Sequence, residues 1–510
     1  MEINNKLFNA EKSFIDLNSI SVKVSEFRFL TVDIMRKHSF IPLESDKNYV
    51  YIAMKNPEDL ISVEKISVLI GRQVYAVPAA EEQIYSLINI FEDMQSTTLI
   101  LEQLKKQEED EIHKRMSSES VNMVVETSPA VRVSNSMIVQ AVNKRASDIH
   151  IEPFETLAVI RYRIDGVLQD IFEMPISLYQ SVCGRIKLEA KMDIAEKRIP
   201  QDGKYKFNNK NIKVDLRIST LPTIYGEKIV IRILYRNEKL LSLNSLGFSD
   251  ESVDVIKSSL NSGYGIIIVT GPTGSGKTTT LYSMLNELDR YNKNIVSIED
   301  PVEIFFDRVN QINVNYKSGL TFANGLRSIL RQDPDVIMIG EIRDADTAHI
   351  AIQAAITGHL VLTTLHTNDA ASSITRLMDM GVPPYLLADS LIACIAQRLV
   401  RKICSFCKTS YAASENENTR LNINSSAHLY KGKGCIFCGH TGYKQRTAVY
   451  EVMSVNSELR GLINKGKSAM DIRSFNKKAG MKTIQQNGYE LVRQGVTTHE
   501  EFIRLTNDNW

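Results

Sequence analysis

The octapeptide GPTGSGKT, residues 271–278, constrains the fold of this chain more than any other feature. It matches the phosphate-binding pattern G-x-x-x-x-G-K-[ST], follows the apolar run GIIIVT (265–270) and opens a segment of helical character, TTTLYSMLNELDR. In such a loop the glycines let the backbone turn tightly and aim N–H groups at phosphate. Lys277 reaches the β- and γ-phosphates, and the Thr278 hydroxyl holds magnesium. Because a chance Gly-rich turn needs no strand before it and no helix after it, we predict a nucleotide-binding α/β domain.

Two further apolar segments end in acidic residues, as expected for strands that place carboxylates near a bound nucleotide. The segments are NIVSIEDPVE, with Glu299, Asp300 and Glu303, and DVIMIGEIRD, with Gly340 and Glu341. Gly340 stands where an Asp usually helps to hold magnesium, but magnesium accepts water ligands and one or two carboxylates suffice. Glu341 can then orient or polarise the attacking water. A plain salt bridge from Glu341 to Arg343 or Arg331 suits the spacing equally well, so both interpretations stay open.

Upstream of the phosphate loop, segments of alternating character carry arginines. In NIKVDLRIST, apolar and polar residues alternate, which predicts a half-buried strand with Arg217 on its polar face. Arg163 of LAVIRYRIDG and Arg232 of EKIVIRILY lie in similar runs. Residues 123–240 are therefore predicted to form an α/β domain that presents arginines from its strands. Solvated surface arginines explain the pattern equally well.

Two C-x-x-C pairs, CSFC and CIFC, have metal-ligand spacing. Their thiols are Cys404, Cys407, Cys435 and Cys438. Four thiolates suit tetrahedral zinc with no open coordination position, which predicts a structural site. Free cysteines or a redox pair are the alternatives, and His440 is a competing ligand that we do not favour. Cys183 and Cys394 lie in apolar helical patterns typical of core, and cysteine use as a whole fits a reduced cytosol.

Charge and hydropathy exclude some classes of protein. The net charge of +1 over 510 residues argues against a strongly basic nucleic-acid binder. No secretory signal is expected, because acids and amides interrupt the first residues. The apolar stretches around 348–365 and 386–400 contain His and Asp, which favours a buried helix and strand over a membrane span. Any membrane association is thus expected to be peripheral.

Four motifs in this order resemble the secretion ATPase superfamily, the hexameric motors of type II secretion and type IV pilus assembly. They are GPTGSGKTTTLY, IEDPVE, GLRSILRQDPDVIMIGEIRDADTA and AAITGHLVLTTLHTNDA. The resemblance extends to ASDIHIEP upstream and to AQRLVRKIC and GYKQRTAVYEVM downstream, and it covers about residues 130–505. The first 120 residues lie outside it. It implies an α/β fold: a RecA-like P-loop ATPase core, a preceding PAS-like α/β domain, an N-terminal α/β module and a small zinc-binding insert.

Domain boundaries follow from this resemblance and from composition. In chain order they are an N-terminal partner-docking module at 1–95, a charged linker at 96–122, an arginine-supplying domain at 123–240 and a C-terminal ATPase domain at 241–510, which includes the zinc-binding segment at 400–445. The linker contains LKKQEEDEIHKRMSSES, which has few large apolar residues and is predicted as linker rather than exposed helix.

The resemblance also implies roles for single residues. The nucleotide-binding loop comprises Gly271, Pro272, Thr273, Gly274, Ser275, Gly276, Lys277, Thr278 and Thr279. Glu299, Asp300 and Glu303 belong to the Asp box, Glu341 ends Walker B, and His359 and His366 belong to the His box, near the γ-phosphate. Arg217 and Arg232, with Arg163 less firmly, reach the nucleotide from the preceding domain, while Arg327, Arg331 and Arg343 surround the acidic strands. Relatives share the glycine before the catalytic Glu, so Gly340 is no defect; Glu341 or Glu303 activates the water.

Two departures from the family limit what is carried over. Gln445 and Ala448 stand where many relatives have glycine, although Arg446, a candidate contact to a neighbour's nucleotide, is kept. Many pilus-assembly relatives also begin with an Arg-Leu-Gly module that can bind a cyclic dinucleotide. We do not find it in residues 1–100, so regulation by such a ligand is not carried over.

The expected function is that of a hexameric cytoplasmic ATPase, peripheral at the inner membrane, that uses ATP, Mg²⁺ and a structural Zn²⁺. It would power type IV pilus assembly through a polytopic inner-membrane platform protein and a membrane-associated assembly protein. Type II secretion is the nearest alternative. A DNA-translocating motor and a non-hydrolysing nucleotide-gated scaffold are the remaining ones, and no nucleic acid is expected as partner.

Overall fold

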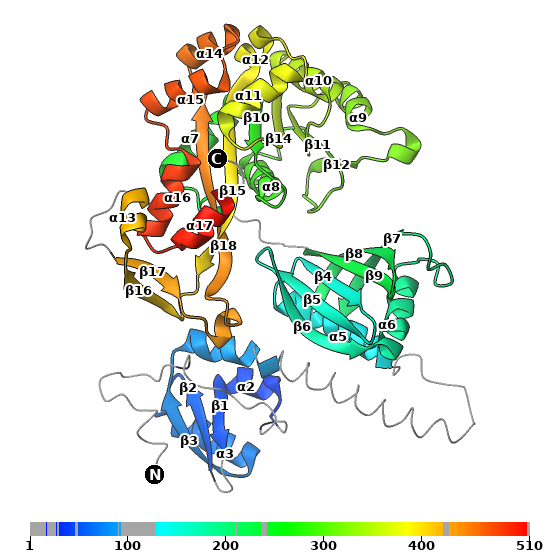
Figure 1. The fold of residues 1–510 in the computed structure, drawn as a ribbon, viewed down its shortest axis with the longest axis vertical. Coiled ribbons are helices and arrows are strands. Elements are labelled where there is room, and N and C mark those ends of the chain that lie inside the picture. Colours follow the sequence, from blue (N-terminus) through cyan, green and yellow to red (C-terminus); the bar gives the residue numbers. More distant parts are fainter. Residues whose placement is uncertain are drawn as a thin grey trace. The chain divides into compact units, whose positions relative to one another are not determined.

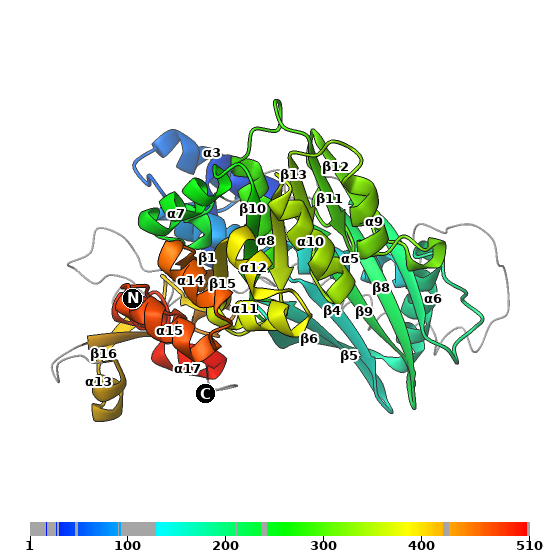
Figure 2. The same ribbon diagram turned by 90° about the horizontal axis from the view of Figure 1, so that it is seen from above.

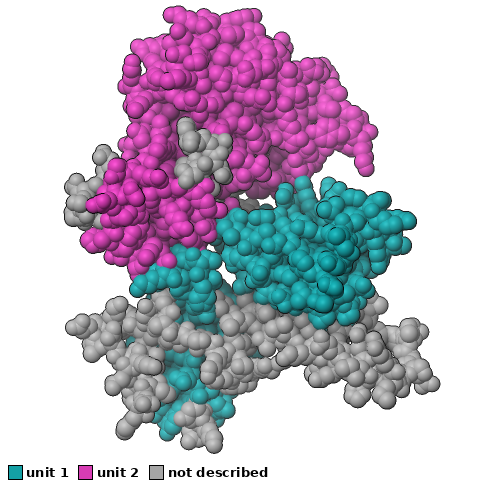
Figure 3. All heavy atoms as spheres, in the orientation of Figure 1, with its two compact units in different colours: residues 1–235, 404–407, 433–442 teal, residues 236–403, 408–432, 443–510 magenta. Residues whose placement is uncertain are grey.

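The chain divides into two compact units, which are coloured separately in Figure 3. The computed structural model describes residues 17, 27, 30–45, 49–89, 91–92, 129–209, 212–235, 242–421 and 428–506. The first unit runs to Tyr235 and includes 404–407 and 433–442, and the second holds the rest. The two cysteine segments are thus grouped with the first unit, and the domain bounds expected from the sequence stay a prediction. The expected linker at 96–122 lies outside the described residues.

The second unit is built on a sheet of seven strands in the order β12-β11-β13-β14-β10-β15-β18. All neighbours are parallel except β15 and β18, which pair antiparallel. The strands are β10 (Gly265–Thr270), β11 (Ile295–Glu299), β12 (Val309–Asn313), β13 (Val336–Ile339), β14 (Leu360–Leu365), β15 (Leu391–Ile403) and β18 (Tyr443–Ser454). A separate hairpin joins β16 (Lys408–Ala412) to β17 (His428–Gly432).

Helices cover both faces of this sheet (Figures 1 and 2). They are α7 (Asp250–Leu260), α8 (Lys277–Glu287), α9 (Phe322–Ile329), α10 (Ala345–Ile356), α11 (Ala370–Asp379), α12 (Pro384–Ser390), α13 (Glu415–Leu421), α14 (Ser457–Asn464), α15 (Ala469–Lys478), α16 (Ile484–Arg493) and α17 (His499–Thr506), with 3₁₀ turns η3 (Asn244–Leu246), η4 (Tyr316–Ser318) and η5 (Ile436–Cys438). Every residue of β10, β13 and β14 is buried, which explains why these strands are unbroken apolar runs. Ligands of such sheets bind beyond the carboxyl ends of the strands, where the phosphate loop follows β10.

The first unit contains an antiparallel sheet of six strands in the order β6-β5-β4-β9-β8-β7. Its elements are α5 (Pro129–Asn143), β4 (Asp148–Pro153), β5 (Leu157–Ile164), β6 (Val167–Pro175), α6 (Ile176–Glu189), β7 (Gln201–Asn209), β8 (Ile212–Thr223) and β9 (Gly226–Tyr235). Apolar side chains of α5 and α6 share one core with the sheet. In β8, Val214, Leu216 and Ile218 are buried and alternate with more exposed residues, which confirms the predicted half-buried strand.

A small module begins the described chain. Its elements are α2 (Val32–His38), β1 (Phe40–Ser45), β2 (Tyr49–Met54), α3 (Leu60–Ile70) and β3 (Gln73–Pro78). β1 pairs antiparallel and β3 parallel with β2. This is the expected N-terminal α/β module. Among the described residues of the whole chain, no helix is both long and apolar enough to cross a membrane.

Candidate functional site

The phosphate loop leaves the carboxyl end of β10 and turns into α8. Gly276 caps α8 in the left-handed region at φ 85°, and Gly274 is left-handed as well at φ 79°. A side chain at Gly271 would meet the Gln397 carbonyl oxygen at 2.4 Å. These positions therefore require glycine, and the helix N-terminus behind them favours an anion. The expected strand, loop and helix are all present around GPTGSGKT.

Gln397 of β15 forms hydrogen bonds to this loop and to α8, a role that the sequence did not predict. Its Nε2 donates to the Ser275 carbonyl at 2.8 Å, and its Oε1 accepts from Thr280 Oγ1 at 2.8 Å. Gln397 is 1% exposed, so both bonds are buried. The only signal in the sequence is the polar residue in the apolar run LIACIAQRLV. Since Gln397 bonds to the loop and to α8 together, it fixes the direction in which the loop faces.

The Lys277 side chain folds back onto the start of the phosphate loop. Its Nζ donates to the carbonyl oxygens of Gly271 at 2.8 Å and Pro272 at 3.1 Å. Burial lowers the pKa of Lys277 to about 8, and the negative charge of Glu341 acts in the opposite direction. The Lys277 ammonium and the Glu341 carboxylate are thus within electrostatic reach of each other, because they follow two parallel strands, β10 and β13, that end at the same edge of the sheet.

Glu341 follows β13 and is held by two partners. Arg343 forms an ion pair with its Oε1, and His366 Nε2 lies 3.1 Å from its Oε2. Burial by itself would raise the pKa of Glu341, but the hydrogen bonds and charges of Arg343 and His366 outweigh it and lower that pKa. Glu341 is therefore ionised at neutral pH. The salt bridge to Arg343 that the spacing allowed is present, and it leaves the carboxylate at the edge where the phosphate loop lies.

Glu299, at the end of β11, is buried, and its contact with nucleotide stays a prediction. It is 2% exposed and accepts hydrogen bonds from Tyr282 of α8, from Ser297 Oγ at 2.6 Å and from Gln311 Nε2 at 3.3 Å. Burial raises the pKa of Glu299. The carboxylate thus braces β11 against α8 inside the protein. The neighbouring carboxylates of Asp300 and Glu303 are exposed and remain the candidates from this segment.

His359 does not lie beside Glu341 and His366, and its role near the γ-phosphate stays a prediction. It precedes β14, and its carbonyl oxygen accepts from Gly265 N, the first residue of β10, at 3.0 Å. His366 follows β14 at the other end, and six residues of strand span about 20 Å. The His359 ring bonds instead to the Ala354 carbonyl at 2.9 Å. Parallel strands put these two histidines at opposite edges of the sheet.

Arg331 also lies at the edge where strands begin. The Gln332 carbonyl beside it accepts from Asn294, directly before β11, at 2.8 Å. Arg331 itself donates to the Arg327 carbonyl at 2.9 Å, and Arg327 donates to Asn324 at 3.3 Å. Of the three arginines expected around the acidic strands, Arg343 contacts Glu341, whereas Arg327 and Arg331 contact their own helix and its end.

The arginines of the first unit share the face of the sheet opposite α5 and α6. Arg217 and Arg232 are directly opposite each other on β8 and β9. Asp148 of β4 pairs in register with Arg232 and Arg163, and it receives the Arg232 Nε at 3.2 Å and lies 3.6 Å from the Arg163 Nε. Like charges placed opposite on neighbouring strands repel. The Arg163 and Arg232 guanidinium groups thus flank the Asp148 carboxylate, and Arg217 lies opposite Arg232 on the next strand.

The four cysteines meet in one cluster with the spacing that zinc requires. All four sulfur atoms lie within 4.8 Å of one another. Three of the distances are 3.8 Å (Cys404–Cys435), 3.9 Å (Cys407–Cys438) and 3.7 Å (Cys435–Cys438). Ligands about 2.3 Å from a tetrahedral zinc are about 3.8 Å apart, whereas disulfide sulfurs are about 2.05 Å apart. The set therefore fits a closed zinc site and not a redox pair.

Backbone groups support this cluster. The N–H groups of Cys435 and Gly442 each donate to Cys438 Sγ at 3.2 Å. With the Cys404 thiol, which has the largest effect, they hold the pKa of Cys438 below its ordinary value and favour the thiolate, the form that binds metal. Among the described residues the cluster consists of cysteines, so His440 is not part of it.

A mostly parallel sheet with a phosphate loop after β10 and a held carboxylate after β13 defines a P-loop nucleoside triphosphatase of RecA-like architecture. Residues 124–504 match the family described as "Type II/IV secretion system protein", and the chain belongs to this family of secretion-system ATPases. Residues 11–98 match the MshEN domain. The family resemblance that we described for the sequence did not cover the first 120 residues, and this match adds a known domain within them.

Relatives from both branches of the family are similar to this chain. The "Type II secretion system protein HxcR" of Pseudomonas aeruginosa is 45% identical over 74% of this chain and 78% of its own length. "Type IV pilus assembly ATPase PilB" of Myxococcus xanthus is 37% identical over 96% of this chain and 88% of its own length. PilB of Thermus thermophilus is 40% identical over 94% of this chain, which spans 54% of that longer protein.

Solved structures agree with the fold. The pilus retraction motor PilT with bound ADP is 28% identical, with a TM-score of 0.51 over 73% of this chain and 96% of that one. The Legionella pneumophila ATPase DotB, 20% identical, shares the fold with a TM-score of 0.56 over 77% of this chain and 99% of that one.

Proposed function

We propose that this chain is the ATPase motor of a type IV pilus assembly system. As a hexamer on the cytoplasmic side of the inner membrane, it hydrolyses Mg²⁺-ATP and drives pilin addition through a polytopic platform protein and a membrane-associated assembly protein. One observation carries the choice of system. The two PilB proteins align over 94% and 96% of this chain, N-terminal module included, whereas HxcR aligns over 74%.

Type II secretion is the second candidate, because identity to HxcR reaches 45% over the aligned part. Deletion of the gene in its own host separates the two. Loss of surface pili with normal release of secreted enzymes supports the proposal, and the reverse phenotype moves the chain to secretion. Light scattering of the purified protein with ATP tests the hexamer. Turnover that responds to DNA, and not to the platform protein, would move the chain to the translocating motors.

Residues of the loop, Glu341 and the arginine face take separate roles in this proposal. The loop and Lys277 bind the β- and γ-phosphates, and Thr278 helps to hold magnesium, which neutralises charge on the phosphates. Glu341 accepts a hydrogen bond from the attacking water and orients it, with Glu303 as the rival for this role. Arg217 and Arg232 supply positive charge to the transferring phosphoryl group, which is the arginine-finger effect.

Replacement of Arg217 by alanine is expected to lower ATP turnover by about 10³-fold, the low end of measured arginine-finger effects. The expected cause is loss of charge stabilisation in the transition state, so KM for ATP should change much less. Lys213→Ala is the matched control, since Lys213 is an exposed cation four residues earlier on β8 and on the same face. Equal turnover in Arg217→Ala and Lys213→Ala would leave the arginine face without a catalytic role.

Affinity of the nucleotide-free protein for ATP is expected to fall as pH rises above about 8, because burial lowers the pKa of Lys277 to about 8. The ammonium that attracts phosphate exists below this pKa and is lost above it, so Kd should rise by up to about tenfold per pH unit there. Titration with a fluorescent ATP analogue from about pH 6.5 to about pH 9.5 measures the slope. In Lys277→Arg the guanidinium stays charged, and the slope should vanish. A slope that persists in this variant would assign the titration to another group.

A further inference from the structure

A buried carboxylate, Glu451 of β18, joins the starts of two helices. Its Oε1 accepts from the Ala370 N–H, the first of α11, at 2.8 Å, and its Oε2 accepts from the Ile484 N–H, the first of α16, at 3.1 Å. Glu451 is 5% exposed, and Ala370 and Ile484 are buried as well. A helix N-terminus carries partial positive charge, so two of them offset the cost of burying the carboxylate.

The first of these helices begins directly after the residues that reach the nucleotide site. His366, whose Nε2 lies 3.1 Å from Glu341, is four residues before Ala370. Between them, Thr367 ties the segment to the last residue of β10. The Thr367 N–H donates to Thr270 Oγ1 at 2.9 Å, and the two hydroxyl oxygens are 2.7 Å apart. The segment between His366 and α11 is therefore hydrogen-bonded to Thr270, the residue directly before the phosphate loop.

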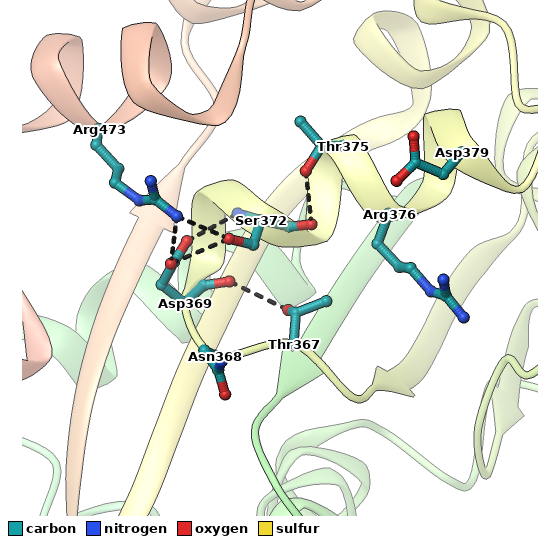
Figure 4. Close-up of a pocket in the computed structure, with 8 residues that line it drawn as sticks. All are labelled: Thr367, Asn368, Asp369, Ser372, Thr375, Arg376, Asp379 and Arg473. Carbon is teal, nitrogen blue, oxygen red and sulfur yellow. Dashed lines mark hydrogen bonds and ion pairs between the residues drawn. The ribbon is translucent and has the colours of Figure 1, made fainter. Parts of the chain in front are cut away.

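Asp369, the N-cap of α11, ties this helix to α15 (Figure 4). Its Oδ1 accepts from the Ser372 N–H at 2.8 Å, and Arg473 of α15 donates to its Oδ2 at 2.7 Å and to Ser372 Oγ at 2.9 Å. These residues line a pocket of about 330 Å³, and Arg376 points away from the Asp369–Arg473 pair. The start of α11 thus involves two acids: its N-cap Asp369, which binds Arg473 of α15, and Glu451 of β18, which accepts from the Ala370 N–H.

We propose that Glu451 is a positioning residue for ATP hydrolysis: it fixes the first residue of α11 and thereby keeps the His366 ring on Glu341. The proposal rests on the hydrolytic function of the site described above. Glu451 touches neither the phosphate loop nor Glu341, so it acts through the segment 366–369. Two further properties follow. First, the Glu451 carboxylate joins the start of α16 to the start of α11. Second, a side chain with only one acceptor atom cannot replace it, because each carboxylate oxygen accepts from a different helix.

The test compares Glu451→Gln with Glu501→Gln. The amide introduced by Glu451→Gln has nearly the size of the carboxylate but offers one acceptor, so one helix N–H faces an NH₂ group. Glu501 of α17 is the matched control. It is also a buried carboxylate, 2% exposed, and it accepts from Arg401 at 2.6 Å rather than from a residue of α11. Four quantities are measured for each full-length variant: Tm, kcat for ATP, KM for ATP, and the ¹³Cε1 chemical shift of His366, assigned through His366→Gln.

The expected result is a fall of about tenfold in kcat for Glu451→Gln with KM within about twofold of wild type, a split that removal of a transition-state contact produces. The His366 shift should move in Glu451→Gln and stay unchanged in Glu501→Gln at similar Tm. Equal loss of kcat in both variants, or an unmoved His366 signal, would overturn the proposal. If wild type itself shows no turnover, the hydrolytic function fails, and the His366 shift still reports whether Glu451 positions the ring.

Discussion

Turnover of ATP by the Glu341→Gln variant is expected to fall about 10²- to 10³-fold below wild type, the range found when a base or a charge-stabilising group is removed. Gln keeps the size of the side chain but not the negative charge that orients the attacking water. The pKa of Glu341 is lowered by Arg343 and His366, which outweigh burial, so the native group is ionised at neutral pH and has a full charge to lose. ATP affinity should change little, because the loop and Lys277 bind the phosphates.

Two measurements make this prediction decisive. Single-turnover hydrolysis separates the chemical step from product release, and equilibrium binding of ATP checks that the loop is intact. Glu303→Gln is assayed in parallel, since Glu303 is an exposed carboxylate of the segment after β11 and the rival for this role. If Glu341→Gln turns over as fast as wild type while Glu303→Gln does not, the water is activated from the segment after β11 and Glu341 is left with its salt bridge.

Loss of one ligand from the cysteine cluster is the second large effect. Purified wild type is expected to hold about one zinc per chain, and Cys404→Ser to hold little. Structural zinc binds with about 10–16 kcal/mol in small zinc-finger peptides, and in such sites binding energy is folding energy. We therefore expect the segments 404–407 and 433–442 to become sensitive to protease and the variant to unfold at lower temperature. The seven-stranded sheet has its own apolar cores and should keep ATP binding.

Cys183→Ser and Cys394→Ser are the matched controls for this experiment. Both cysteines are buried outside the cluster, so both variants should keep the zinc content of wild type. Metal analysis together with limited proteolysis before and after a chelator gives the readout. A wild type without metal, whose four thiols titrate freely when folded, would contradict the zinc assignment.

Local sequence was sufficient for those parts of the site whose chemistry lies within a few consecutive residues. GPTGSGKT specifies a strand, a turn and a helix start, because only glycine adopts the left-handed turns at Gly274 and Gly276 without strain. The cysteine cluster was predictable for a similar reason, since two C-x-x-C pairs leave few alternatives to a tetrahedral ligand set. The alternation of apolar and polar residues in β8 predicted which face of the strand is buried, and it placed Arg217 on the opposite face.

Tertiary structure decided which residues share an edge of the sheet. His359 and His366 lie in one short motif, yet β14 separates them, because a strand extends about 3.3 Å per residue. Glu299 and Asp300 are adjacent in sequence, but the pleat turns one into the core and the other out. The side chains of Gln397 and Glu451 bond to groups more than thirty residues away in the sequence, so no local pattern indicates their roles. The sequence by itself determined the chemistry available to this protein, and the register of its parallel strands determined which of those groups can act together.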